Sequence, residues 1–241
     1  MDTTLSRELY DRWHADLPAD AESDAPWHDL VRKHLRPQDV AGRSLLEIGC
    51  GRGGFSCWLA SQAEPPARLV GADFSAAAID KARELAERMA INSVDWRVAD
   101  IERLPFEDNT FDTVISCETI EHVPSPRVAV AELARVLRPR GRLLLSTPNY
   151  LGGMGLYRAY LRCVGRRYTE GGQPINHFNM LPRTRRWVAA AGLRIVTSDG
   201  TGHYLPVPGR RPIEMRWLNS PRILMHWLAL HSLVIAEKPA A

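Results

Sequence analysis

Short apolar segments alternate with amphipathic segments along much of the chain, and this alternation constrains the fold more than any other feature. The apolar segments, which we predict to be strands, are residues 44–50, 68–74, 94–100, 111–117 and 141–149. Helical spacing occupies residues 53–63, 75–90 and 126–140. Strands without a polar face belong in a parallel sheet that helices cover on both sides. Each helix then connects two parallel strands, and such strand–helix–strand connections are right-handed. The sequence therefore predicts an α/β fold with a doubly wound, mostly parallel sheet.

The composition indicates a globular protein. The chain has 241 residues, 45% hydrophobic and 24% charged, and no apolar run approaches the length needed to span a bilayer. The N-terminal residues lack the apolar stretch of a signal peptide. The four cysteines are scattered, which argues against a disulfide framework or a thiolate zinc site; they are Cys50, Cys57, Cys117 and Cys163. We expect one domain, residues 1–241, in the cytoplasm.

The segments on either side of the alternating core differ from it in pattern, and we expect them to cover the core or its binding site. Residues 1–36 form a helical cover, broken near Pro18 and Pro26, and residues 40–150 form the core. After residue 150 the alternation lapses, leaving a helix at 181–192 and strands at 193–198 and 231–238. The irregular segments 150–180 and 200–230 are long enough to be lids over a binding site. Residues 151–222 hold 12 Arg, no Lys and 3 acids, a net charge of +9, which leaves −6 for the rest.

Acidic residues stand at the ends of the first three predicted strands. Glu47 lies within a glycine-rich turn made with Gly49, Gly51 and Gly53, and Asp73 and Asp100 end the next two strands. The Gly-x-Gly-x-Gly spacing and the acid in the turn disfavour a dinucleotide pyrophosphate and suit a ligand that carries an ammonium group. Each acid alone is explained better as a strand-end cap than as a ligand-binding residue. Together they lie at the sheet edge where such folds bind ligands.

Four motifs carry a family resemblance: LLEIGCGRG, GADFS, VADIERLPFEDNTFDTVISCETIEHV and ELARVLRPRGRLLLSTPN. In this order they resemble the motifs of class I S-adenosylmethionine-dependent methyltransferases. The resemblance implies a seven-stranded sheet whose last strand is antiparallel. It also implies site residues for S-adenosyl-L-methionine: Glu47, Gly49, Gly51 and Gly53 around the methionine, Asp73 at the ribose, Phe74, Asp100 and Ile101 at the adenine, and Cys117 on the methionine side.

The segment after the fourth strand suggests a metal site. If residues 118–122 are helical, Glu118, Glu121 and His122 share one face, and His177 is the candidate to complete the set. Glu-x-x-Glu-His at this place resembles ubiquinone-biosynthesis O-methyltransferases and small-RNA ribose 2′-O-methyltransferases. Such ligands suit Mn, Fe or Zn at least as well as Mg. Two other interpretations stay open: His122 or His177 as a metal-free general base, or a capping Glu and a packed His.

Arginines and aromatic residues in the predicted lids, and arginines at the start of the predicted helix 181–192, bear on the acceptor. They suit an acidic or aromatic small molecule, or less well an RNA end. The apolar residues of the second lid could form a wall for an aromatic or lipid-like acceptor, but they are explained better by the core or a homodimer contact. Three aromatic residues of the N-terminal helices are further candidates to cover the site. These residues are Arg158, Arg162, Arg166, Arg167, Arg183, Arg185, Arg186, Tyr157, Tyr160, Tyr168, Trp217, Leu218, Ile223, Leu224, Met225, Trp227, Leu228, Tyr10, Trp13 and Trp27.

We therefore expect a methyltransferase that acts on a small molecule, at oxygen, with or without a divalent metal. Three alternatives remain open. The first alternative is an RNA ribose 2′-O-methyltransferase, and the second is a metal-free N- or C-methyltransferase of a secondary metabolite. The third is a cofactor-binding protein without catalysis.

Overall fold

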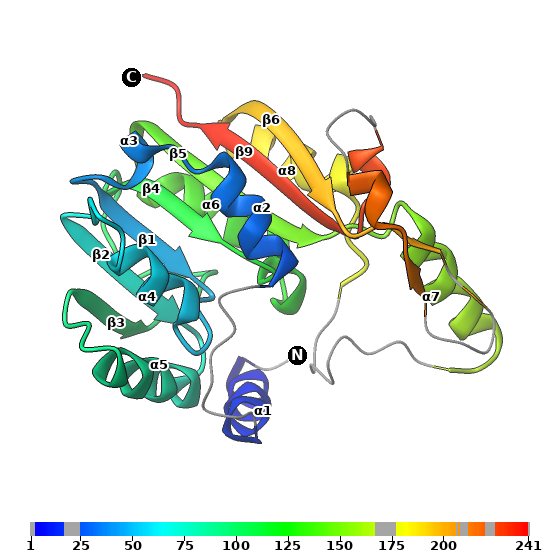
Figure 1. Cartoon of the computed structure of the whole chain (residues 1–241), viewed down its shortest axis with the longest axis horizontal. Coiled ribbons are helices and arrows are strands. Elements are labelled where there is room, and N and C mark those ends of the chain that lie inside the picture. Colours follow the sequence, from blue (N-terminus) through cyan, green and yellow to red (C-terminus); the bar gives the residue numbers. More distant parts are fainter. Residues whose placement is uncertain are drawn as a thin grey trace.

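A seven-stranded sheet forms the centre of the fold (Figure 1). The computed structural model describes residues 3–16, 25–166, 177–205, 207, 212–219 and 225–240. The strand order is β3-β2-β1-β4-β5-β9-β6, and β9 runs antiparallel to both β5 and β6. The strands of the sheet are β1 (Ser44–Ile48), β2 (Arg68–Asp73), β3 (Val94–Val98), β4 (Phe111–Ser116), β5 (Leu137–Pro148), β6 (Arg194–Thr201) and β9 (His231–Glu237). This order confirms the predicted doubly wound, mostly parallel sheet.

Helices cover both faces of the sheet because neighbouring strand residues face opposite ways. In β1, Leu45 and Leu46 are fully buried, and they belong to different apolar clusters on the two faces. The first cluster includes residues of α2 and α4, and the second includes residues of α6 and α8. The helices are α1 (Thr3–Asp16), α2 (Pro26–His34), α3 (Pro37–Val40), α4 (Gly54–Ala60), α5 (Ala76–Arg88), α6 (Pro126–Val136), α7 (Gly153–Cys163) and α8 (Leu181–Ala190).

The helix predicted for residues 126–140 is wrong in its last turn. Helix α6 ends at Val136, and β5 begins at Leu137, which pairs with Phe111 of β4. Pro139 lacks an amide donor and disfavours a helical conformation at the residue before it, so the helix cannot continue. Residue Arg140 then adopts a φ of 64°. The strand expected at 141–149 therefore starts four residues earlier, at Leu137.

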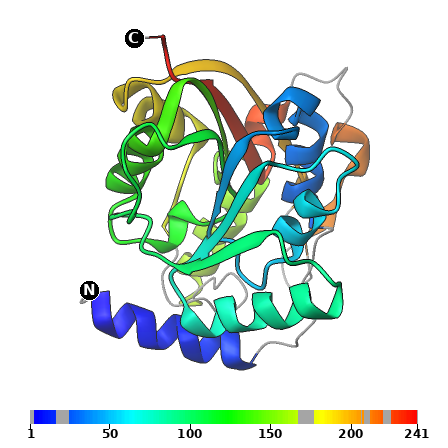
Figure 2. The same cartoon turned by 90° about the vertical axis from the view of Figure 1, so that its left-hand side faces the viewer.

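The segments outside the core are partly described. Helix α1 packs against α5, at the bottom of Figure 2, and Pro18 lies outside the described residues. The first predicted lid contains α7. The second contains the hairpin β7 (Tyr204–Leu205) and β8 (Ile213–Glu214), and the 3₁₀ turns η2 (Arg216–Asn219) and η3 (His226–Leu228). Within the described ranges, no helix is both long and apolar enough to cross a membrane.

We predict that Gly53→Ala destabilises the fold more than Gly192→Ala. Both glycines have a φ of 82°, which costs an L-residue about 1–2 kcal/mol. A Cβ at Gly53 would also lie 2.6 Å from Trp96 and 2.7 Å from Ala82, whereas Gly192 has nothing within 4 Å. The overlap should lower the free energy of unfolding by roughly a further 1–3 kcal/mol, measured by urea denaturation. Equal losses in the two variants would contradict the packing explanation.

Candidate functional site

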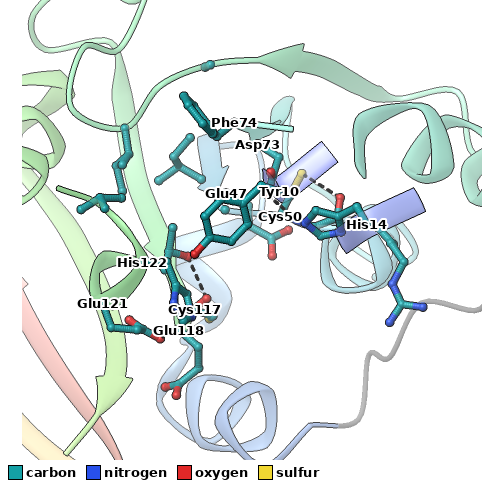
Figure 3. Close-up of a pocket in the computed structure, with 18 of the residues that line it drawn as sticks. Tyr10, His14, Glu47, Cys50, Asp73, Phe74, Cys117, Glu118, Glu121 and His122 are labelled. Atoms are coloured by element: carbon teal, nitrogen blue, oxygen red, sulfur yellow. Dashed lines mark hydrogen bonds and ion pairs between the residues drawn. The ribbon is translucent and has the colours of Figure 1, made fainter. Parts of the chain in front are cut away.

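A cavity of about 560 Å³ opens at the carboxyl ends of β1 to β4. Helices α1 and α2 close it from outside the sheet with three aromatic side chains, Tyr10, Trp13 and Trp27. Figure 3 shows Tyr10 and His14 of α1 facing the side chains that end the strands. The volume is typical of a small-molecule pocket.

The turn after β1 is fixed to the end of β2 by backbone hydrogen bonds. The amides of Gly49 and Cys50 donate to the Ala72 carbonyl at 2.8 and 3.0 Å. The Gly51 amide donates to Asp73 Oδ2 at 2.9 Å. Gly49 has a φ of 77°, and a Cβ there would overlap the Thr119 side chain, so the turn requires glycine.

Glu47 is a buried acid at the base of this turn. Its side chain lines the cavity, and the Ser56 hydroxyl donates to its carboxyl group. Burial, with a smaller contribution from Asp73, raises the pKa of Glu47 from 4.5 to about 8. The carboxyl group is therefore neutral at pH 7 in the ligand-free protein, and a cation placed beside it would favour its ionisation.

The other two strand-end acids also face the cavity. Asp73 Oδ1 accepts from the Ser75 amide at 2.9 Å, and Asp100 Oδ1 accepts from the Glu102 amide at 2.9 Å. The structure thus gathers Glu47, Asp73 and Asp100 around one cavity. Phe74, Ile101, Cys117, Gly49 and Gly51 also line it. Gly53 is not among the lining residues, and it caps α4 instead.

The expected helical face at residues 118–122 does not form. Glu118 has a φ of 47°, and only a three-residue 3₁₀ turn, η1 (Ile120–His122), follows it. Glu118 accepts from the Ser146 hydroxyl at 2.9 Å and pairs with His231 Nδ1 at 3.1 Å. The direction of the Glu118 side chain is therefore set by residues of β5 and β9.

Glu121 is directed toward different partners. It is fully buried and accepts from the Thr147 hydroxyl at 3.0 Å. His122 Nε2 lies 3.4 Å from the other carboxylate oxygen, within ion-pair distance. Of these residues, Glu118, Glu121 and His122 line the cavity.

The four predicted metal ligands do not fit a metal centre. His177 Nε2 lies 2.8 Å from the Val123 carbonyl oxygen, and His177 is not among the lining residues. Across the described ranges, no three His, Cys, Asp or Glu side chains are grouped so that they could hold an ion. The expectation of a shared face was wrong because Glu118 stands before the turn in a left-handed conformation, so Glu118 and Glu121 are not one helical turn apart.

Three histidines at or beside the cavity escaped the sequence interpretation. His14 and His28 line it from α1 and α2, and His231 supports Glu118 from β9. His28 stacks on Phe55, with ring centroids 4.8 Å apart. No local signal marks these residues, since a histidine on an amphipathic helix, such as His14 or His28, or at the start of a strand, such as His231, is usually a packing or surface residue. Their significance depends on which strand ends the helices cover.

None of the described arginines of the predicted lids or of α8 lines the cavity, and among the described residues Arg52 is the arginine that does. Arg158 stacks over Tyr150 at 4.6 Å, and Arg185 donates to the Ser198 hydroxyl at 2.5 Å. Trp217 is 67% exposed and does not line the cavity, and neither does Trp227. Arg167, Tyr168, Ile223 and Leu224 lie outside the described residues.

Known proteins resemble this chain in sequence and in fold. The family model described as "Methyltransferase domain" matches residues 46–145. The ubiquinone biosynthesis O-methyltransferase of Coxiella burnetii is 31% identical over 190 residues, 73% of this chain and 74% of that protein. An uncharacterized 37.1 kDa protein in transposon TN4556 from Streptomyces fradiae is 34% identical over 137 residues; the match covers 54% of this chain and 39% of that relative.

One solved structure shows how far the likeness of fold extends. In the complex of the Haloferax volcanii Trm112 methyltransferase activator with a methyltransferase, a chain that is 20% identical superposes with a TM-score of 0.69. The match covers 95% of this chain and 97% of that one. At this identity the likeness concerns the fold alone.

We predict that Glu47 makes stability fall as the pH rises. Between pH 4.5 and about 8 the folded protein holds a proton on Glu47 that the unfolded chain has released. The free energy of unfolding should therefore fall by up to about 1.4 kcal/mol per pH unit. Glu47→Gln removes this contribution, which urea denaturation at several pH values measures as the difference from wild type. The exposed control Glu107→Gln should keep it, and a wild-type slope in Glu47→Gln would contradict the assignment.

Proposed function

Because this chain belongs to the S-adenosylmethionine-dependent methyltransferases, we propose that its cavity binds S-adenosylmethionine and directs methyl transfer to an oxygen of a small-molecule acceptor. The observation that carries this proposal is the meeting of Glu47, Asp73 and Asp100 with the Glu121–His122 pair around one cavity. The acids form one wall for a cofactor, and the pair offers a base on another. The O-methyltransferase name of the Coxiella burnetii relative supports the choice of oxygen.

The cavity walls fit a sulfonium nucleoside that carries an amino-acid group. Asp73 has both oxygens fixed by amides, and their remaining lone pairs are available to ribose hydroxyl groups. Glu47, neutral when the cavity is empty, becomes the partner of an ammonium group. We assign Asp100, Ile101 and Phe74 to the adenine, and Cys117, Gly49 and Gly51 to the methionine. We assign Gly53 a supporting role, because it shapes the turn without lining the cavity.

The protein's main chemical task is to remove the acceptor proton. When bound, S-adenosylmethionine supplies an electrophilic methyl group, so little further activation of that partner is required. We assign His122 as the general base, held by the buried carboxylate of Glu121. The bound cofactor would supply the methyl group and leave as the neutral thioether, and the His122 imidazole would accept the proton that the acceptor hydroxyl loses. Proton transfer to a positioned general base raises the reaction rate roughly 10²–10⁴-fold. We assign no step to a metal, because Glu118 pairs with His231 and His177 contacts the Val123 carbonyl oxygen.

The acceptor side of the cavity favours an aromatic molecule. Trp27, Val123 and Pro124 line it with apolar surface, and Tyr10 lies with its ring centroid 6.2 Å from that of His122. A phenol is also easier to deprotonate than an aliphatic hydroxyl. We keep residues 40–150 as the cofactor core and residues 1–36 as its cover. Residues 150–180 and 200–230 remain proposed lids, although their described residues do not line the cavity.

We predict that Asp73→Ala weakens S-adenosylmethionine binding. A buried carboxylate that accepts two ribose hydroxyl groups should change the Kd at least about tenfold when it is removed. Isothermal titration calorimetry measures the change, and thermal unfolding shows whether the variant folds. Asp95→Ala, on the exposed Asp95–Arg97 pair of β3, is the control and should bind as wild type does. An unaltered Kd in Asp73→Ala would remove the assignment of the ribose site.

We predict that His122→Ala lowers kcat for a phenolic acceptor about 10²–10⁴-fold and leaves the KM for S-adenosylmethionine within about threefold. His226→Ala, in η3 away from the cavity, serves as the control. Methyl transfer is followed with tritiated cofactor and a panel of phenols, amines and an RNA oligomer, with and without excess chelator. Transfer only to amine or RNA, or loss of activity in chelator that Mn²⁺ restores, would contradict the proposal.

A further inference from the structure

Helix α1 brings a buried imidazole to the cavity from the side opposite the sheet. His14 lines the cavity and is only 8% exposed. Its Nδ1 is buried and has no hydrogen-bond partner within the part of the chain that the structure describes. In Figure 3, His14 lies beside the turn that carries Cys50 and close to Asp73. A buried ring nitrogen without a partner at a cavity wall indicates a missing hydrogen-bonding group.

Two sets of hydrogen bonds hold α1 in this position. Asp11 Oδ1 accepts from the Ser75 hydroxyl at 2.6 Å and from the Ala77 amide at 3.3 Å, at the start of α5. The Lys81 ammonium group donates to the carbonyl oxygens of His14 and Ala15 at 2.7 and 3.0 Å, at the end of α1. Because Ser75 also donates its amide to Asp73, one short turn positions both the carboxylate and the helix that faces it.

The surroundings of His14 favour a neutral partner. Burial lowers the pKa of His14, and Arg52 and Lys81 act in the same direction, while Asp73 and Asp11 oppose them. The imidazole is therefore neutral at pH 7, with one N–H donor and one acceptor. A neutral ring suits a hydroxyl group better than a carboxylate. On Asp73, a ribose hydroxyl group donates its hydrogen to the carboxylate and keeps lone pairs that an N–H can reach.

We propose that His14 is a further cofactor-binding residue, which hydrogen-bonds a ribose hydroxyl group of the bound nucleoside opposite Asp73. This inference rests on the proposed function, because it takes Asp73 as the ribose site. It makes α1 part of the binding site itself. The cofactor is then held between the end of β2 and a helix that lies before the core in the sequence.

The test compares ligands with and without ribose hydroxyl groups. We measure the Kd of S-adenosylhomocysteine and of its 2′-deoxy and 3′-deoxy analogues by calorimetry. His14→Ala should raise the Kd of S-adenosylhomocysteine about tenfold. For the analogue that lacks the contacted hydroxyl group, wild type and His14→Ala should agree within about twofold. His14→Asn places a polar atom near the position of Nδ1 and should restore at least part of the loss.

The control and the opposing outcomes separate the two proposals. Arg12→Ala changes an exposed residue of α1 and should bind every ligand as wild type does. Equal losses for all three ligands in His14→Ala, without rescue by His14→Asn, would show a packing role and overturn the inference. So would an unchanged Kd for S-adenosylhomocysteine. In both cases the proposed function stands if Asp73→Ala still weakens binding. A wild-type protein that binds none of the ligands would overturn the proposed function and the inference together.

Discussion

The hydrogen bond from the Gly51 amide to the Asp73 carboxylate joins the two strand ends around which the cavity is built. With it, the turn after β1 is held against the end of β2, so two loops far apart in sequence form one wall. The second oxygen of Asp73 is held by the Ser75 amide, and the Ser75 hydroxyl bonds Asp11 of α1. A single carboxylate therefore organises the turn, the start of α5 and the helix that covers the cavity.

The second constraint is the burial of Glu47, which opposes stability. A carboxyl group removed from water and supported by one serine hydroxyl is ionised only at an unfavourable cost, so it stays protonated up to about pH 8. A leucine or methionine at this place would pack without that penalty. The cost becomes useful when a cation enters, because ionisation of Glu47 then places a full negative charge where water cannot screen it. Burial of Glu47 thus costs stability, and under the proposed function its ionisation would favour the ammonium group of the cofactor.

The sheet could be predicted because its signals are local. A strand such as β1, with Leu45 and Leu46 facing opposite apolar clusters, is apolar throughout, and that pattern is visible without any tertiary information. The acids at strand ends followed from the same reasoning, since parallel strands place their carboxyl ends at one edge. The end of α6 was placed too late, at Pro139 and Gly141, because helical spacing continues past Val136. There the pairing of Leu137 with Phe111 decides the conformation, and that contact is not local.

The arrangement of Glu118, Glu121 and His122 was harder to predict than the strand-end acids, because the φ angle of Glu118 decides it. In a helix, Glu118 and Glu121 would converge, and with His122 they would resemble a metal site. The φ of 47° at Glu118 separates them, and each carboxylate pairs with a different histidine. His231 stands 113 residues away from Glu118, so no spacing rule could find it. A left-handed non-glycine residue is retained only where its surroundings stabilise it, and here Ser146 and His231 hold the side chain. The same five-residue motif therefore places His122 beside the buried Glu121 carboxylate, the arrangement that we propose as the general base.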